Sequence, residues 1–247
     1  MDESRRYPRG QNNGTDRDRH DRHRSIYLGH RLEDGRISIG CSRFSIAAHQ
    51  RSGHPGSKGG VILHMKFNVH AGHNPDGKIA CGAVGLIRES TEARKVKKEV
   101  IKLLRQKGHT VYDCTCQNGT SQTDVLKRIV TKCNQHKVDL DISIHFNSGV
   151  ADKKGNGKTT GTEVWVYSQT SSAKPTAERV VKEIAALGFH NRGVKDRKDL
   201  YVLRRTNSPA MLVECCFVDD KDDVKLYDAK KMAAAIVDGI FVNSQKK

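Results

Sequence analysis

Two spacings of hydrophobic residues alternate along the chain after Met65. Short apolar or alternating runs predict strands, and apolar residues at three- and four-residue steps predict amphipathic helices. The predicted strands are Lys66–His70, His109–Tyr112, Leu140–Phe146, Gly161–Tyr167, Leu200–Leu203 and Ala210–Glu214. The predicted helices are Ser90–Gln106, Ser121–His136, Thr176–Ala186 and Ala229–Val242. Strands that alternate with helices of this length indicate an α/β domain with a mainly parallel twisted sheet flanked by helices.

The first 64 residues have a different character. They contain few regularly spaced apolar residues and a dense run of Arg, Asp and His over residues 16–24. This composition predicts a disordered basic extension over residues 1–64, followed by a single folded domain over residues 65–247. Met65 is a second candidate for the natural start, because codons for Lys58–Gly60 can spell a ribosome-binding stretch just upstream.

Charge narrows the possible partners. The 247 residues include 44 Lys and Arg against 28 Asp and Glu, a formal net charge of +16. Such a surface attracts polyanions, whether nucleic acid, acidic lipid or an anionic cell-wall polymer. The chain has one Trp and no aromatic cluster interleaved with basic residues. Stacking on bases needs such aromatic side chains, so nucleic acid is not the expected partner.

Two further features bear on where the protein works. No stretch approaches the roughly 18 consecutive apolar residues of a membrane helix, and Met1–Glu3 leads into arginines instead of an apolar export signal. Seven scattered cysteines fit a reducing compartment better than a disulfide framework. We therefore expect no transmembrane segment and a protein that stays cytoplasmic until it is released.

Candidate chemistry gathers at the ends of the predicted strands. His73 follows the first strand, His145 lies near the end of Leu140–Phe146, and Glu214 ends the last strand, while Glu89 precedes the first long helix. Ligands of such sheets bind beyond the carboxyl ends of the strands. Two imidazoles and one carboxylate are the ligand set of a catalytic zinc, which leaves the other carboxylate for proton transfer.

Each of these residues also has a purely structural interpretation. A His at a strand end is commonly held by hydrogen bonds alone, and Glu89 can favour the positive end of a helix dipole. Glu214 follows an apolar run and precedes Cys215 and Cys216, so it is not expected to be fully solvated. Only the combination of the four residues favours a metal site.

Four motifs extend this argument to a known family. They are Val69–Asn74 (VHAGHN), Gly85–Glu89 (GLIRE), Ser143–Asn147 (SIHFN) and Pro209–Glu214 (PAMLVE). With these motifs in this order, the chain from Lys66 to Val242 resembles the zinc-dependent N-acetylmuramoyl-L-alanine amidases of bacterial autolysins and phage endolysins.

The resemblance implies a function and a role for each site residue. His73, Glu89 and His145 would bind one Zn2+, and Glu214 would be the catalytic acid/base. The reaction would hydrolyse the amide bond between N-acetylmuramic acid and the L-alanine of the stem peptide in peptidoglycan. Two interpretations of the net positive charge stay open: it holds the enzyme near anionic wall polymers, or it serves only to keep the domain soluble.

Some points stay open at this stage. Relatives commonly have an acidic residue where this chain has His70, which makes His70 a competing ligand. A zinc carboxypeptidase acting on the stem peptide is an alternative, with Arg192, Arg204 or Arg205 as the group that recognises a terminal carboxylate. A basic nucleic-acid-binding protein is the alternative from another class. The cysteines lack the spacing of a structural zinc site and are expected to be buried thiols.

Overall fold

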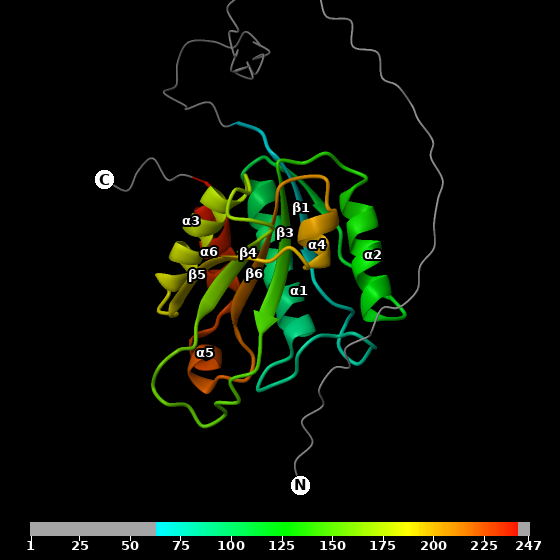
Figure 1. Cartoon of the computed structure of the whole chain (residues 1–247). Coiled ribbons are helices and arrows are strands. Elements are labelled where there is room, and N and C mark those ends of the chain that lie inside the picture. The colour runs from blue at the N-terminus through cyan, green and yellow to red at the C-terminus, as the bar shows by residue number, and fades with distance from the viewer. Residues whose placement is uncertain (1–62, 242–247) are drawn as a thin grey trace, which may run out of the picture. The chain divides into compact units, whose positions relative to one another are not determined.

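A computed structural model of the protein describes residues 63–241 and contains one six-stranded sheet (Figure 1). The strands are β1 (Lys66–Ala71), β2 (Thr110–Asp113), β3 (Leu140–Asn147), β4 (Thr162–Val166), β5 (Asn191–Asp196) and β6 (Ala210–Phe217). Their order across the sheet is β2-β1-β3-β6-β4-β5. All neighbours are parallel except β4 and β6, which are antiparallel, so the predicted mainly parallel sheet is confirmed. The extension predicted over residues 1–64 lies almost wholly outside the described residues.

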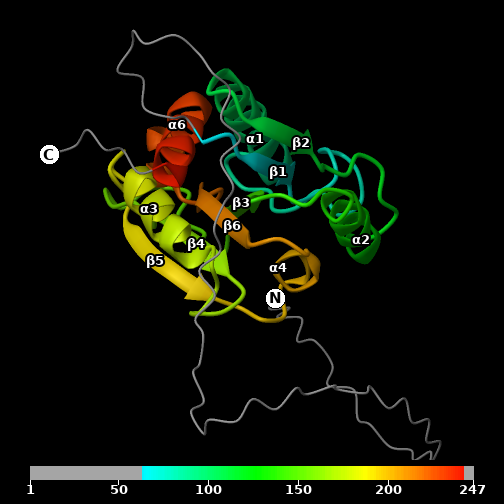
Figure 2. The ribbon, with the colours of Figure 1, turned by 90° about the horizontal axis from the view of Figure 1, so that it is seen from above.

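Helices cover the sheet on both sides. They are α1 (Glu89–Gln106), α2 (Gln122–Cys133), α3 (Lys174–Ala185), α4 (Tyr201–Arg205), α5 (Lys221–Leu226) and α6 (Ala229–Ile240). Figure 2 shows α1, α3 and α6 on one side of the sheet and α2 and α4 on the other. Of the helices within residues 63–241, none has the length and the apolar character needed to cross a membrane.

The alternation of side chains along the strands divides the buried residues between the two faces. On the first face, residues such as Val69, Ile144 and Val213 join one large apolar cluster with α1, α3 and α6. On the second face, a smaller cluster joins Leu212 to the inner sides of α2 and α4. The cysteines at 114, 116, 133, 215 and 216 are buried free thiols, as their sequence context predicts.

One prediction of local structure is wrong, and one strand has no counterpart among the predicted elements. The segment predicted as a strand at Leu200–Leu203 is instead the start of the short helix α4, whose Val202 and Leu203 pack onto the second face. Four apolar residues cannot by themselves distinguish a strand from a helical turn. The edge strand β5, with the sequence NRGVKD, was not predicted, because its residues are polar and only partly buried.

Candidate metal centre and active site

Three of the predicted site residues meet beyond the carboxyl ends of β1 and β3. His73 lies in the loop after β1, Glu89 is the first residue of α1, and His145 lies near the end of β3. Nε2 of His73 is 3.2 Å from Oε1 of Glu89, and Nδ1 of His145 is 3.0 Å from the same oxygen. Their ligand atoms all lie within 4.8 Å of one another. Residues far apart in sequence thus form one compact group that could hold a metal ion.

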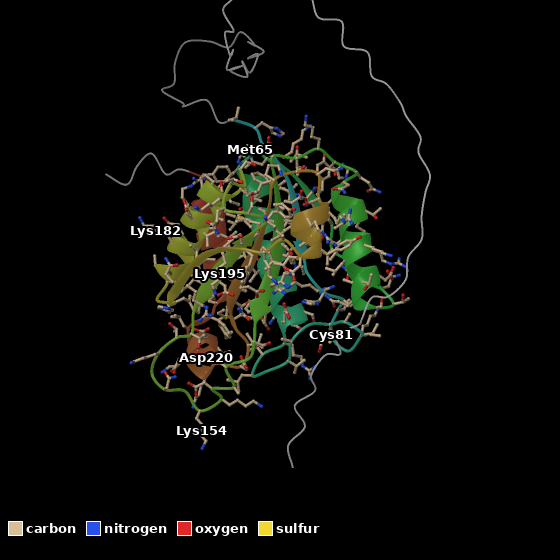
Figure 3. All side chains as sticks on the ribbon, in the orientation of Figure 1. Met65, Cys81, Lys154, Lys182, Lys195 and Asp220 are labelled. Carbon is tan, nitrogen blue, oxygen red and sulfur yellow. The ribbon has the colours of Figure 1, made fainter. Side chains whose placement is uncertain are left out.

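Two glycines make room for this group. A Cβ added at Gly72 would lie 1.8 Å from Nε2 of His145, so the imidazole occupies the space of the missing side chain. At Gly82, in the loop that also carries Cys81 (Figure 3), a Cβ would lie 2.5 Å from Oε2 of Glu89. The positions of the histidine and the glutamate therefore depend on the absence of side chains at these two residues.

Glu89 is held as a carboxylate by its surroundings. Its Oε2 accepts a hydrogen bond from the backbone N–H of Ala83 at 2.7 Å, and its Oε1 accepts one from Phe146 at 3.2 Å. Burial alone would raise the pKa of Glu89, but hydrogen bonds from His145 and His73 outweigh it and hold that pKa well below its usual range. An ionised carboxylate is the state that binds a cation.

The imidazole of His145 is suited to the same task, because burial lowers its pKa and favours the neutral ring. Nδ1 of His73 is buried and has no hydrogen-bond partner among the described residues. The other nitrogen of this ring, Nε2, is the one that lies beside Glu89, so Nδ1 is a buried nitrogen that remains for a bound ligand to satisfy. The donor set of two nitrogens and one carboxylate fits a zinc ion.

Arg94 fixes the loop that carries His73. From α1, its Nη2 donates to the backbone oxygens of His73 at 2.9 Å and Cys116 at 2.8 Å. Its Nη1 donates to the oxygens of Asn74 at 3.2 Å and Ser90 at 3.3 Å. One guanidinium thus ties the loops after β1 and β2 to the first helix. The sequence gives no signal for this role, because an arginine within an amphipathic helix usually lies on the solvated face.

Glu214 lies directly across from His145 in the register of β6 and β3. Its Oε2 is buried without a hydrogen-bond partner among the described residues. Burial, followed by the negative charges of Glu89 and Glu163, raises the pKa of Glu214 well above its ordinary value. A carboxyl group whose pKa is raised in this way holds a proton more readily than an ordinary carboxylate, which suits it to proton transfer.

Glu163 extends this row of acidic residues onto β4, where it is the antiparallel partner of Glu214. Its Oε2 accepts hydrogen bonds from Nε of Arg192 at 2.7 Å and from Nζ of Lys195 at 2.5 Å. Its Oε1 accepts one from Nδ2 of Asn147 at 2.9 Å. Arg192 is thus already engaged by a buried carboxylate, which it shares with Lys195. This weakens the case for Arg192 as the group that recognises a terminal carboxylate.

His70 does not join the group of possible ligands. Its imidazole is fully buried, and its Nδ1 lies 3.4 Å from the hydroxyl oxygen of Ser143. Burial, with the neighbouring His145, lowers the pKa of His70 to about 3. Of the two histidines that flank Ala71 and Gly72, only His73 reaches Glu89.

A second acidic group has a structural role. Carboxylate oxygens of Asp152, Asp220 and Asp222 lie close together near the start of α5. They accept hydrogen bonds from the backbone of the preceding loop, including those from Asn156 to Asp222 at 2.8 Å and from Thr160 to Asp220 at 3.0 Å. These aspartates anchor the loop that precedes β4.

The chain also matches a known protein family. The family described as N-acetylmuramoyl-L-alanine amidase matches residues 68–242. The chain belongs to this amidase family. The match begins within β1 and includes all four predicted site residues.

The chain is also similar to individual proteins. An uncharacterised protein of Clostridium perfringens is 39% identical over 167 residues, covering 67% of this chain and 48% of the relative. The endolysin of Bacillus phage SPP1 is 29% identical over 181 residues, covering 69% of this chain and 61% of the phage protein. The chain thus spans about half to three fifths of the length of these relatives.

A solved structure agrees with the fold. The catalytic domain of the CD27L endolysin targeting Clostridia Difficile is similar with a TM-score of 0.63 and 26% identity, covering 72% of this chain and 97% of that domain. The mixed α/β fold predicted from the sequence is therefore the fold of an amidase catalytic domain.

Proposed function

We propose that this amidase is a peptidoglycan hydrolase that cleaves the amide bond between N-acetylmuramic acid and the L-alanine of the stem peptide. His73, Glu89 and His145 would hold one zinc ion, and Glu214 would be the catalytic acid/base. The observation that carries the proposal is the convergence of the three ligand residues, whose donor atoms lie within 4.8 Å of one another. The register of the sheet supports the role of Glu214, which faces His145 from the adjacent strand.

The residues divide the chemistry between them. When bound, zinc polarises a carbonyl group and makes water acidic enough to supply hydroxide near neutral pH. The lowered pKa of His145 favours its neutral ring and the lowered pKa of Glu89 favours its carboxylate, which are the forms that binding a cation requires. Arg94 and the two glycines hold these donors in place, so the site is organised before any substrate arrives.

Glu214 would move the proton. Its Oε2 accepts a proton from the attacking water and then returns it to the nitrogen of L-alanine as the carbon–nitrogen bond breaks. The products are a carboxylic acid on the lactyl group and a free amine on the peptide. Proton transfer of this kind typically contributes about 10²–10⁴-fold to the rate. The raised pKa of Glu214 supports this role, because a carboxylate with an ordinary pKa is a weaker base.

Metal content and product analysis together test the proposal. We expect Glu214→Gln to retain zinc at wild-type stoichiometry and to lose at least about 10²-fold in turnover. His145→Ala should lose both the metal and the activity. Glu178→Gln, which makes the same change at an exposed residue of α3, should retain both. Undiminished hydrolysis after exhaustive chelation would contradict the metal role.

The identity of the products separates the amidase from the carboxypeptidase alternative. An amidase releases intact stem peptides with a free N-terminal alanine, which mass analysis of digested peptidoglycan would detect. Release of a single C-terminal amino acid would instead support a carboxypeptidase, with Arg204 or Arg205 as the remaining candidates for carboxylate recognition.

A further inference from the structure

Three adjoining hollows surround the β2 edge of the sheet. One lies along α2 and reaches Lys78 in the loop after β1, another lies along α1, and the third lies between β2 and the end of α2. The first two share Gln117, the first and third share Lys132, and the second and third share Arg105. The two larger hollows have volumes of about 800 Å3 each. We call this continuous surface the basic groove; in Figure 2, β2 lies at the sheet edge between α1 and α2.

Positive charge dominates the basic groove. Its lining includes Lys78, Arg94, Lys97, Lys98, Lys102, Arg105, Lys127, Arg128 and Lys132. The carboxylates that line it are Asp113 and Asp124. Each carboxylate already binds one of the cations, Asp113 with Lys97 at 2.6 Å and Asp124 with Arg128 at 2.8 Å.

Several of the remaining cations are held in place by neutral groups. Nζ of Lys78 donates to the backbone oxygen of Gln117 at 3.0 Å, and Nζ of Lys132 donates to that of Thr115 at 2.7 Å. Nη2 of Arg105 donates to the backbone oxygen of Val111 at 2.8 Å. A carbonyl oxygen positions a cation without neutralising it, so these charges remain available to an anion.

The cations at the opposite edge of the sheet, formed by β5, have different partners from those of the basic groove. Within β5, Arg192 and Lys195 both bind Glu163. Figure 3 labels Lys195. Arg197 binds Asp199 at 2.9 Å. At the β5 edge three cations therefore share two carboxylates. In the basic groove three of the nine cations bind a carboxylate, namely Lys97, Arg128 and Lys102, the last through Glu99 at 3.6 Å.

We infer that the basic groove binds a linear polymer with a phosphodiester backbone, as found in anionic cell-wall polymers. The cations extend over three hollows, which suits a chain of repeated charges better than a single small anion. The choice of a wall polymer among polyanions rests on the proposed function. The lining offers little for stacking on bases, because Tyr112 is already covered by the ring of His136 with a centroid separation of 3.7 Å.

The groove also adjoins the candidate metal centre. Lys78 lies in the loop that follows His73, and Arg94 of the groove is hydrogen-bonded to the backbone of His73. A polymer bound there would hold the enzyme at the wall with the metal centre close to the neighbouring glycan and peptide. Binding in the groove and hydrolysis are separate properties and can be measured separately.

The test compares two triple variants of the full chain. Lys98→Gln/Lys102→Gln/Lys127→Gln removes three exposed charges from the groove. Lys182→Gln/Lys230→Gln/Lys231→Gln removes three exposed charges from α3 and α6, where Figure 3 labels Lys182. The probe is poly(glycerol phosphate) of defined length, and its dissociation constant is measured at low salt. The second measurement is the rate at which each variant cleaves a small soluble muropeptide.

We expect the groove variant to bind the polymer roughly 10- to 100-fold more weakly than wild type, with a shallower salt dependence. The α3/α6 variant should change less than about threefold, and muropeptide cleavage should be unchanged in both. The inference would be overturned if both variants bound the polymer equally weakly, or if neither bound it more weakly than wild type. So would tighter binding of duplex DNA than of poly(glycerol phosphate) at equal phosphate concentration. Groove-dependent binding without muropeptide cleavage would leave the groove standing and reject the proposed function.

Discussion

On one face of the sheet, the central strands contribute apolar side chains to a core covered by α1, α3 and α6. On the other face, the same strands carry a row of polar residues that runs from Asn68 and Asp141 through His145 and Glu214 to Glu163. The side chains alternate along each strand, so a single set of backbone positions supports both faces. The first face supplies stability, and its rigidity allows the second face to hold groups whose burial is costly.

Two glycines offer the most direct way to separate the two faces. Gly239→Ala places a Cβ 2.5 Å from Cα of Val180, where α6 packs on α3. Gly72→Ala places one 1.8 Å from Nε2 of His145. We expect Gly72→Ala to lower turnover by about 10²-fold or more, because the ring must leave its place. Gly239→Ala should instead cost about 1–3 kcal/mol in the free energy of unfolding and leave turnover per folded molecule unchanged.

Urea unfolding, zinc titration and turnover, measured on both glycine variants, would check this division. A Gly72→Ala protein that keeps wild-type zinc affinity would show that the His145 ring tolerates displacement. A Gly239→Ala protein with intact stability and reduced turnover would show that the apolar face acts directly on the site.

The cost of burying charge on the polar face can be measured at Asp141. Burial raises its pKa to about 6, although a hydrogen bond from Nδ2 of Asn68 at 2.6 Å opposes the rise. A carboxyl group whose pKa is raised in the folded state favours folding at low pH, and that contribution is lost as pH rises through the folded pKa. From pH 4 to 8 the loss approaches about 3 kcal/mol.

We therefore expect Asp141→Asn to be more stable than wild type at pH 8 and similar to it at pH 4. The measurement is the free energy of unfolding in urea across this range. Asp238→Asn, at an exposed position of α6, serves as the control and should follow the wild-type curve. If the free energy of unfolding had the same pH dependence in Asp141→Asn and wild type, Asp141 would not be the source of the stability lost at high pH.

A smaller effect is expected from Arg94→Lys. A lysine has a single nitrogen and cannot reach the four backbone oxygens that the guanidinium binds. We expect zinc affinity to fall by about 10-fold, since groups that position metal ligands typically contribute that much. Arg105→Lys, on the same helix, has one such oxygen to lose and should keep wild-type affinity. Zinc affinity is measured by competition with a chelator. Equal affinities for wild type, Arg94→Lys and Arg105→Lys would show that Arg94 does not position the metal ligands.

The sequence predicts the parts of the molecule whose residues repeat with a clear period. The long helices and buried strands have such periods, and so the sheet and its neighbours were predicted. The helix at Tyr201–Arg205 and the polar edge strand β5 are too short or too exposed for periodicity to identify. These segments take their conformation from the surface on which they pack.

The residues of the site also divide into those that the sequence predicts and those that it does not. His73, His145 and Glu214 are recognisable because they follow strands, and Glu89 because it begins a helix within a known motif. The structure brings these residues together; the role of each stays a prediction until metal and products are measured. Arg94 and the fit of His145 over Gly72 were not predicted, because they depend on contacts between segments that no local pattern encodes.

The position of β6 has a consequence for synthesis of the chain. Of the strands within residues 63–241 it is the last in sequence, yet it lies between β3 and β4 in the sheet. A nascent chain that ends before Ala210 contains five strands but leaves the facing sides of β3 and β4 without their partner. Such open edges promote aggregation. Because β6 also carries Glu214, a chain that ends before Ala210 lacks both the strand that joins the two halves of the sheet and the side chain proposed to move the proton.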